Sequence, residues 1–255
     1  KDLLHLPVDF VDDCIGEKVR TAVKRSPKPS VVLLENVRFY VAEEKNDSEF
    51  AKKIVKSSLA DYFVQDGFGV VHRAHASTAA ITQWLPSVAG LLLEREVSTI
   101  TNAMSHPDHP LVAVLGGAKV SDKLPLMEAL EPIADTVVIG GAMANTFLAA
   151  KGVAMGASKF EQDQDKQIAA IYTRAAQKVG SENVDSFLQL PTDVAVAKRP
   201  TAEAKRKNVP IRAIAPDDRA LDIGDETTER YVQVIEKAKT VIWNGTMGFA
   251  ELPEF

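Results

Sequence analysis

Two glycines and two lysines lie close together near the middle of the sequence, and these residue types suit the binding of a phosphate group. Gly116 and Gly117 have no Cβ, so their backbone N–H groups can approach a ligand closely. Lys119 and Lys123 follow them and would add two positive charges at the same point. The alternative remains open that the glycines only form a tight turn and that water solvates the lysines, because a motif of this kind is only a hypothesis.

The elements on either side of these residues would position them. Residues 112–115 form a short, unbroken apolar run that predicts a strand buried on both faces. Residues 121–130 have apolar side chains at helical spacing, with Ser121 as the expected N-cap and Pro125 in the first turn. A helix N-terminus carries partial positive charge and favours an anion at this junction. The spacing matches neither the P-loop nor the Gly-x-Gly-x-x-Gly fingerprint.

Arginines follow two other predicted strands. Arg38 comes after the strand expected at residues 31–34, and Arg73, with His72 beside it, comes after the strand expected at residues 62–64. Parallel α/β proteins bind ligands outside the carboxyl ends of their strands, which makes these arginines candidate anion ligands. Considered alone, Arg38 is better explained as a surface residue that extends over apolar neighbours.

Metal and disulfide chemistry find little support in the sequence. His72 and His75 could share a helix face, but they lack a His-Glu-x-x-His motif and a nearby third ligand, so we do not expect a metal site there. Cys14 is the single cysteine, which excludes a disulfide within the chain and is typical of a small buried hydrophobic residue.

Composition indicates an ordinary globular protein with a large core. Of the 255 residues, 45% are hydrophobic and 25% are charged, and no apolar run is long enough for a membrane span. The formal net charge of −5 argues against a broad nucleic-acid surface and leaves clustered cations for an anionic small molecule. We expect a cytoplasmic protein that contacts neither membrane nor nucleic acid.

Strands, glycine turns and helices alternate along much of the chain, which predicts an α/β fold with a mainly parallel sheet and helices on both faces. Gly140 and Gly141 end a strand at residues 136–139 just as the first glycine pair does. Helices are expected at residues 48–59 and 143–151, and further strands at 187–190 and 240–243.

A helix starting at Pro86 and Ser87 and running to about Met104 is the candidate link between two domains. The predicted organisation is therefore a first domain at residues 1–85, an interdomain helix at 86–105 and a second domain at 106–255.

Several separated stretches together resemble the phosphoglycerate kinase family. In chain order they are Leu33-Leu34-Glu35-Asn36-Val37-Arg38-Phe39, Asp66-Gly67-Phe68-Gly69, His72-Arg73-Ala74-His75, Gly116-Gly117-Ala118-Lys119-Val120-Ser121-Asp122-Lys123, Ile139-Gly140-Gly141 and Trp243-Asn244-Gly245-Thr246-Met247-Gly248. Their order and separation also fit the family, and the resemblance covers nearly all of the chain.

The resemblance implies two Rossmann-like domains joined by a helix about which they bend. It implies a phosphotransferase with a carboxyl group as acceptor, which moves a phosphoryl group between 1,3-bisphosphoglycerate and ADP to give 3-phosphoglycerate and ATP in glycolysis. The implied cofactors are ATP or ADP with Mg²⁺, and the implied state is a monomer.

The resemblance also implies roles for individual residues. By motif position, Arg38, His72 and Arg73 would bind the phosphorylated glycerate, and Lys119 would be the catalytic residue that meets the transferred phosphoryl group. The implied nucleotide-binding residues are Gly117, Lys119, Lys123, Gly140, Gly141, Asn244 and Glu251. No metal ligand is implied within the chain.

The sequence departs from the family pattern at a few positions. Thr246 stands where the family usually has proline, and Phe249-Ala250 replaces Val-Phe, which leaves the adenosine contacts uncertain. Ala142 stands where a third glycine is common and Gln65 where asparagine is common.

Loops that the family carries before Lys1 and after Phe255 are missing, so we expect a central fragment with two incomplete domains and no appreciable kinase activity by itself. Two other hypotheses remain: a non-catalytic nucleotide-binding α/β module, and a Rossmann dehydrogenase, which the missing glycine fingerprint disfavours.

Overall fold

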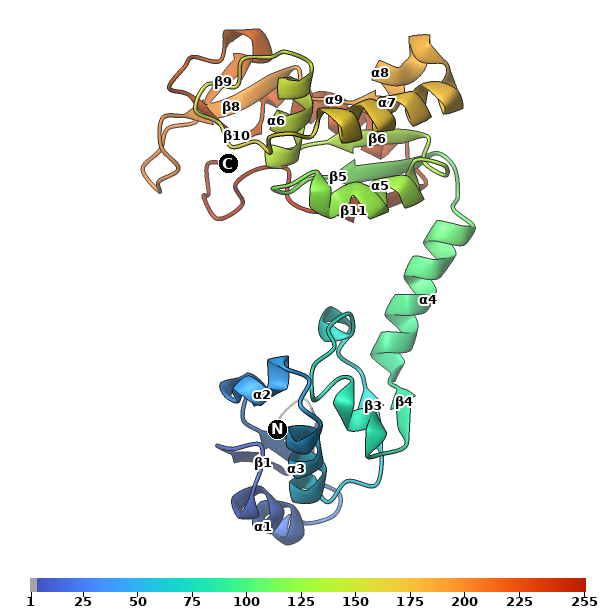
Figure 1. The fold of residues 1–255 in the computed structure, drawn as a ribbon, viewed down its shortest axis with the longest axis vertical. Helices are drawn as coiled ribbons and strands as arrows, with labels where there is room; N and C mark the ends of the chain where they lie inside the picture. The colour runs from blue at the N-terminus through green and yellow to red at the C-terminus, as the bar shows by residue number, and fades with distance from the viewer. Residues whose placement is uncertain (1–3) are drawn as a thin grey trace. The chain divides into compact units, whose positions relative to one another are not determined.

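The computed structural model describes residues 4–255, which divide into two compact units, the first ending at Ile100 and the second running from Thr101 to Phe255 (Figure 1). The division falls within helix α4 (Leu91–Ser105). Among the described residues, no helix is both long and apolar enough to cross a membrane.

The first unit contains two short pairs of parallel strands with helices between them. Strand β1 pairs with β2, and β3 pairs with β4. Its elements are β1 (Val8–Val11), α1 (Glu17–Arg25), β2 (Val31–Leu34), η1 (Val37–Phe39), α2 (Val41–Glu44), α3 (Ser48–Ser58), β3 (Phe63–Gln65), η2 (Phe68–Val70), η3 (Ala80–Gln83) and β4 (Ser87–Ala89).

The core of the first unit forms around α3, whose ends are fixed by local chemistry. The Asp47 side chain accepts a hydrogen bond from the N–H of Phe50 at 2.7 Å, and Leu59 ends the helix in the left-handed conformation. Phe50 and Ile54 then face a cluster that includes the buried Cys14. The helix predicted at residues 48–59 is confirmed.

The predicted start of the linking helix is wrong. Residues 87–89 form strand β4, where Val88 lies opposite Val64, and the helix begins only at Leu91. The reason is a cap that comes from elsewhere in the chain, because Asp66 Oδ1 accepts hydrogen bonds from the N–H groups of Leu92 and Leu93 at 2.7 and 2.9 Å.

The second unit is built on a parallel sheet with strand order β11-β5-β6-β7. These strands are β5 (Leu111–Leu115), β6 (Thr136–Ile139), β7 (Leu188–Gln189) and β11 (Thr240–Asn244). The strand predictions at 112–115, 136–139 and 240–243 are confirmed within a residue at either end, whereas the run at 187–190 supplies only two strand residues.

Helices cover both faces of this sheet, as predicted. The helices that cover the faces are α5 (Leu124–Leu130), α6 (Gly141–Ala150), α7 (Asp165–Val179), α8 (Val184–Phe187) and α9 (Asp225–Glu236). Alternate residues of β5 point to opposite faces, so Leu111 and Leu115 pack with the first four of these helices while Val112 and Val114 pack with Tyr231 of α9.

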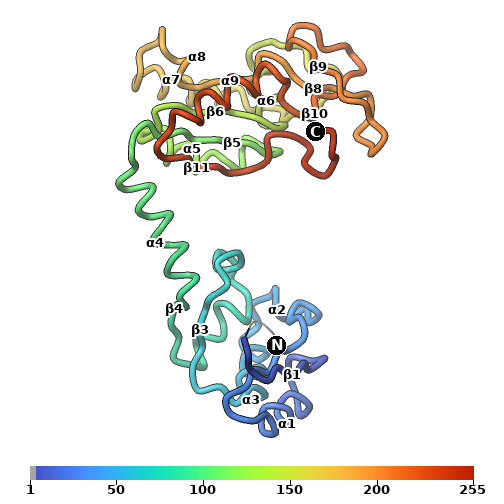
Figure 2. Tube along the Cα trace, turned by 180° about the vertical axis from the view of Figure 1, so that it is seen from behind, coloured from blue at the N-terminus to red at the C-terminus, as the bar shows by residue number. Residues whose placement is uncertain are grey.

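A second sheet in this unit is antiparallel, and the sequence did not indicate it. Its order is β10-β8-β9, with β8 (Asp193–Ala197), β9 (Lys207–Pro210) and β10 (Arg219–Ile223). Helix α6 packs against β10, and the chain that follows β11 returns beside it, where the N–H of Phe249 donates to the carbonyl of Leu221 at 2.8 Å (Figure 2).

Replacing Phe147 with alanine is expected to destabilise the second unit by about 3–5 kcal/mol, because its ring is fully buried in the main core and lies edge-on to Tyr172. Urea unfolding followed by Trp243 fluorescence, in a Trp84→Phe background, measures this free energy. Phe160→Ala is the matched control, since 37% of that side chain is exposed and its loss should cost less than about 1.5 kcal/mol. Equal losses would contradict the assigned core.

Candidate functional site

Three loops meet at the carboxyl ends of strands β5, β6 and β11. The N–H of Gly117 donates to the carbonyl of Thr246 at 2.9 Å, and the N–H of Gly141 donates to the carbonyl of Met247 at 2.7 Å. The N–H of Met143 in turn donates to the carbonyl of Gly117. Backbone atoms of three separate segments therefore form one junction.

Only glycine fits at the centre of this junction. A Cβ on Gly116 would lie 2.1 Å from the carbonyl oxygen of Thr246, and one on Gly245 would lie 2.3 Å from the carbonyl oxygen of Gly116. Gly141 has a φ of +64°, and a Cβ there would lie 2.8 Å from the backbone of Gly117. The glycines are thus required for loop packing.

This corrects part of the sequence interpretation, which expected the glycine N–H groups to face a ligand. The N–H groups of Gly117 and Gly141 are already hydrogen-bonded inside the junction. They support the site by fixing its loops, and the charges for an anion must come from side chains.

The junction also brings together the side chains of two predicted nucleotide residues. Lys123 Nζ donates a hydrogen bond to Asn244 Oδ1, which joins the loop after β5 to the end of β11. Lys119, in the same loop as Lys123, is exposed. The site therefore has one lysine oriented by an amide and a second lysine that is free to reach a ligand in solvent.

The expected cap at Ser121 is wrong. Residues 121–123 form a short 3-10 turn, and α5 starts at Leu124 with Pro125 in its first turn and no side-chain cap. Ser121 instead donates its hydroxyl to Glu161 Oε1 at 2.5 Å and its N–H to Glu161 Oε2 at 3.0 Å. A carboxylate distant in sequence has taken the place of the local cap.

Through this contact Glu161 holds the loop at residues 116–123, which carries Lys119 and Lys123 and is called the lysine loop below. Burial raises the pKa of its carboxyl group, but the hydrogen bonds from Ser121 and the nearby charge of Lys119 outweigh burial and lower the pKa overall. The carboxylate is therefore ionised at neutral pH, with its two oxygens directed to one serine.

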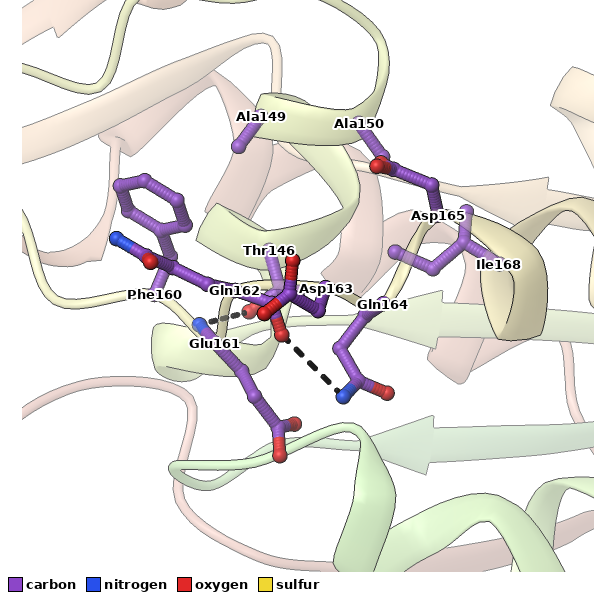
Figure 3. Close-up of a pocket in the computed structure, with 10 residues that line it drawn as sticks. All are labelled: Thr146, Ala149, Ala150, Phe160, Glu161, Gln162, Asp163, Gln164, Asp165 and Ile168. Carbon is purple, nitrogen blue, oxygen red and sulfur yellow. Dashed lines mark hydrogen bonds between the residues drawn. The ribbon is translucent and has the colours of Figure 1, made fainter.

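Glu161 also lines a cavity of about 280 Å³ beside α6 and the start of α7 (Figure 3). Its N–H donates to Thr146 Oγ1 at 3.0 Å, and Asp163 and Asp165 lie around the same cavity. None of the predicted nucleotide residues lines it. Three carboxylates disfavour an anionic ligand there, so we do not assign the nucleotide to this cavity.

A different cavity, of about 390 Å³, opens at the glycine junction. The predicted residues Gly117, Gly141 and Glu251 line it, together with Thr246 and Phe249. Its volume lies within the range typical of small-molecule sites. Sequence reasoning missed the part of its wall that comes from β10, Lys159 and Pro200, because no motif marks those residues.

The predicted ligands of the phosphorylated glycerate all lie in the first unit. Arg38 is in the 3-10 turn η1, which is capped by Asn36, and its side chain is exposed. His72 and Arg73 are exposed in the loop after η2, where the carbonyl of Arg73 accepts hydrogen bonds from Thr78 and His75. The backbone that carries these side chains is thus fixed.

His75 has a different environment from its neighbour. Its Nδ1 lies 3.9 Å from Oε1 of the buried Glu43, which also accepts hydrogen bonds from the hydroxyl and N–H of Ser77. Glu43 and His75 therefore support the loop that presents Arg73.

Comparison with known proteins identifies relatives along the whole chain. The family model for phosphoglycerate kinase matches residues 1–255. A phosphoglycerate kinase from Moorella thermoacetica is 44% identical over 255 residues, which are 100% of this chain and 63% of the relative. A wheat (Triticum aestivum) protein, named phosphoglycerate kinase, cytosolic, is 43% identical over 255 residues, 100% of this chain and 62% of the relative.

A solved structure agrees with these sequence relatives. The structure of phosphoglycerate kinase from Coxiella burnetii is 34% identical with a TM-score of 0.71 and covers 99% of this chain and 61% of that protein. The chain thus spans a little under two thirds of the length of the relatives it matches, and its α/β fold agrees with theirs.

Replacing Gly141 with alanine is expected to destabilise the second unit by at least about 1 kcal/mol more than Gly152→Ala, because the added Cβ overpacks the loop junction. Both residues have a positive φ, but a Cβ at Gly152 meets nothing within 4 Å whereas one at Gly141 meets Gly117. Urea unfolding of both variants measures the difference, which isolates the steric conflict from the backbone preference. Equal destabilisation would show that the loops do not depend on this contact.

The stabilising effect of Glu161 is expected to disappear in acid. Because the folded pKa lies below the ordinary value of 4.5, its contribution is complete above pH 4.5 and is lost as the pH falls through the folded pKa. The difference in unfolding free energy between the parent chain and Glu161→Gln should therefore shrink between pH 6 and pH 3. Asp163→Asn controls for charge in the same loop, and a difference independent of pH would contradict the Ser121 contact.

Proposed function

Because the chain belongs to the phosphoglycerate kinase family, we propose that it serves the reversible transfer of a phosphoryl group between 1,3-bisphosphoglycerate and ADP. The observation that carries this proposal is the match of the family along all 255 residues. It is supported by the glycine junction, which holds the Lys123–Asn244 hydrogen bond and has a cavity lined by Gly117, Gly141 and Glu251 beside it. The proposed products are 3-phosphoglycerate and ATP.

In this proposal the nucleotide binds in the second unit. Gly117, Gly140 and Gly141 shape the loops, Lys123 and Asn244 hold the phosphate end, and Glu251 meets the ribose. Lys119 is the proposed catalytic residue, since an exposed ammonium group can follow the transferred phosphoryl group and screen its charge.

The acid substrate is proposed to bind in the first unit. Arg38 and Arg73 would donate to its phosphate and carboxylate, because a guanidinium group matches the geometry of both, and His72 would assist. In the transfer, the bond from phosphorus to the acyl oxygen breaks as a bond to the terminal oxygen of ADP forms. No covalent enzyme intermediate is needed, because the carboxylate is already a good leaving group.

Magnesium enters this proposal only with the nucleotide. Within residues 4–255 there is no group of three or more His, Cys, Asp or Glu side chains that could hold a metal ion. The chain's own residues therefore do not fit a resident Mg²⁺, and we assign the ion to the phosphates of ADP, where Mg²⁺ commonly binds.

A non-catalytic nucleotide-binding module is the second candidate. It is favoured by a cavity whose lining lies entirely in the second unit. The two candidates share the nucleotide site and differ in chemistry. We further propose a cytosolic location, by analogy with the wheat relative named as cytosolic. The monomer that the resemblance implies stays a prediction.

Lys119→Ala and Lys123→Ala are each expected to weaken Mg-ADP binding, Lys123→Ala by about tenfold because it removes a charge that Asn244 holds in place. Calorimetric titration of the 255-residue chain measures this. Lys56→Ala, an exposed lysine on α3 in the first unit, is the control and should leave the affinity unchanged. A parent chain that does not bind Mg-ADP would refute both candidate functions.

The chain by itself is expected to form ATP from 1,3-bisphosphoglycerate and Mg-ADP at a negligible rate, since it spans under two thirds of the family's length. A coupled ATP assay on the purified chain, with an intact relative as the positive control, measures the rate. Turnover near that of the relative would contradict this expectation and would exclude the non-catalytic alternative.

A further inference from the structure

A further cavity in the second unit has no part in the function proposed above. Its volume is about 520 Å³, and it is lined by residues from the ends of α6 and β7, from α8 and from α9. None of the described residues that line it is assigned to the nucleotide or to the acid substrate. Its apolar wall suits a ligand with a hydrocarbon body and consists of Leu148, Leu188, Leu190, Pro191 and Ile211.

Three charged side chains also line this cavity, namely Lys151, Asp185 and Arg230. Lys151 Nζ lies 2.8 Å from Asp185 Oδ1, so the charges of these two exposed residues compensate each other. Arg230 is partly buried on α9, and among residues 4–255 no carboxylate oxygen lies within 4.0 Å of it. The other polar residues of the wall are uncharged. The cavity therefore has one positive charge without a counter-ion.

The other partly buried arginines show that such a charge is unusual in this chain. All arginines are exposed except Arg174, Arg206 and Arg230. Arg174 is paired with Glu131 at 2.6 Å, and Arg206 is paired with Asp222 at 3.0 Å. Removing a charge from water costs free energy unless an opposite charge or hydrogen bonds compensate it. The guanidinium group of Arg230 therefore favours an anion from outside the chain.

The hydrogen bonds of this guanidinium group are incomplete as well. Nη2 donates to the carbonyl of Leu190, which is the single hydrogen bond of this side chain to the residues that the structure describes. Nε is buried, and neither water nor an acceptor of the described chain reaches it. A guanidinium group has five N–H donors, so the contact with Leu190 holds the group at the cavity wall and leaves donors for a ligand.

The chemistry of the wall selects the kind of anion. A free phosphate carries acceptor oxygens on all sides and would leave some of them unpaired against leucine and isoleucine side chains. A carboxylate places its two acceptor oxygens in one plane, which matches the planar donors of arginine. The hydrocarbon attached to the carboxylate can then cover the apolar wall and gain free energy by burial.

We propose that this cavity binds a small amphipathic monocarboxylate, with its carboxylate group on Arg230 and its hydrocarbon against Leu188, Leu190 and Ile211. The nucleotide site proposed above lies in a different cavity, so the two proposals are independent. Arg230 determines the charge of the ligand, and the apolar wall determines its length.

Calorimetric titration of the 255-residue chain with octanoate, 1-octanol and butanoate tests the proposal. Octanoate is expected to bind saturably and at least about tenfold more tightly than 1-octanol, which has the same number of carbon atoms but no charge to meet Arg230. Butanoate is expected to bind more weakly than octanoate, by about fourfold for each methylene group that it lacks, since each buried methylene group contributes to affinity.

Variants locate the ligand. Arg230→Gln should weaken octanoate binding by at least about tenfold and leave the affinity for 1-octanol unchanged. Arg212→Gln is the matched control, because Arg212 is an exposed arginine of the 3-10 turn η6 (Ile211–Ala213) that does not line the cavity. Urea unfolding shows that each variant is folded. The comparison of octanoate with 1-octanol in the parent chain tests the charge without any substitution.

Four results would overturn the proposal. Failure of octanoate to bind at millimolar concentration would refute the site, and equal affinities for octanoate and 1-octanol would refute the role of the charge. Full affinity for octanoate in Arg230→Gln would place the carboxylate elsewhere. Displacement of octanoate by Mg-ADP would place it in the nucleotide cavity. In each case Mg-ADP binding, measured separately, decides the proposed function.

Discussion

The close backbone contact among three glycine loops is the constraint on which the second unit depends. Gly117 and Gly141 donate to carbonyl oxygens of the loop after β11, so strands β5, β6 and β11 are joined at their carboxyl ends as well as along their lengths. Any Cβ at Gly116, Gly141 or Gly245 would force these loops apart. The lysine loop, the start of α6 and the cavity wall all take their positions from this contact.

Packing beneath the junction makes it rigid. The hydroxyl of Tyr231 on α9 lies 2.9 Å from the carbonyl oxygens of Ile139 and Gln189, at the ends of β6 and β7. Burial raises the pKa of this hydroxyl, which therefore stays protonated and able to donate. Ile139 directly precedes Gly140, so a helix on the far face of the sheet fixes the backbone just before the second glycine pair.

The antiparallel sheet gives the cavity its second wall. Strand β10 packs against α6, and Asn145 links the two by a hydrogen bond to the carbonyl of Ala220. The glycine loops of the parallel sheet line one side of the cavity, and β10 lines another side together with Lys159 and Pro200. The cavity is therefore lined entirely by residues of the second unit.

Local sequence patterns correctly predicted the helices and strands that are determined by residues within the segment itself. Strands β5 and β6 were predicted because continuous apolar runs that end at glycine pairs are typical of buried parallel strands. Helix α3 was predicted because Phe50 and Ile54 have helical spacing. The helix starts that were predicted wrongly depend on distant partners. Asp66 caps α4 from before β4, and Glu161 draws Ser121 away from α5.

The residues of the candidate site also fall into two groups, those that a sequence motif marks and those that only the tertiary structure brings together. Gly117, Lys119, Lys123, Gly141, Asn244 and Glu251 were predicted, because they belong to motifs that the resemblance marks, and their roles remain proposals. Lys159 and Arg219 were not, since each is a single cation without a motif, and only the hydrogen bonds between their segments place them together. The sequence contains both residues, but their proximity is a property of the tertiary structure.

The most direct test of the central claim is amide hydrogen exchange of the 255-residue chain with and without Mg-ADP. If the glycine junction forms the nucleotide site, the ligand should slow exchange in the three loops at residues 116–123, 140–143 and 244–251, with residues 157–160 and 218–221 slowed as well. Unchanged exchange in these loops, or protection confined to the acidic cavity around residues 161–165, would contradict the account.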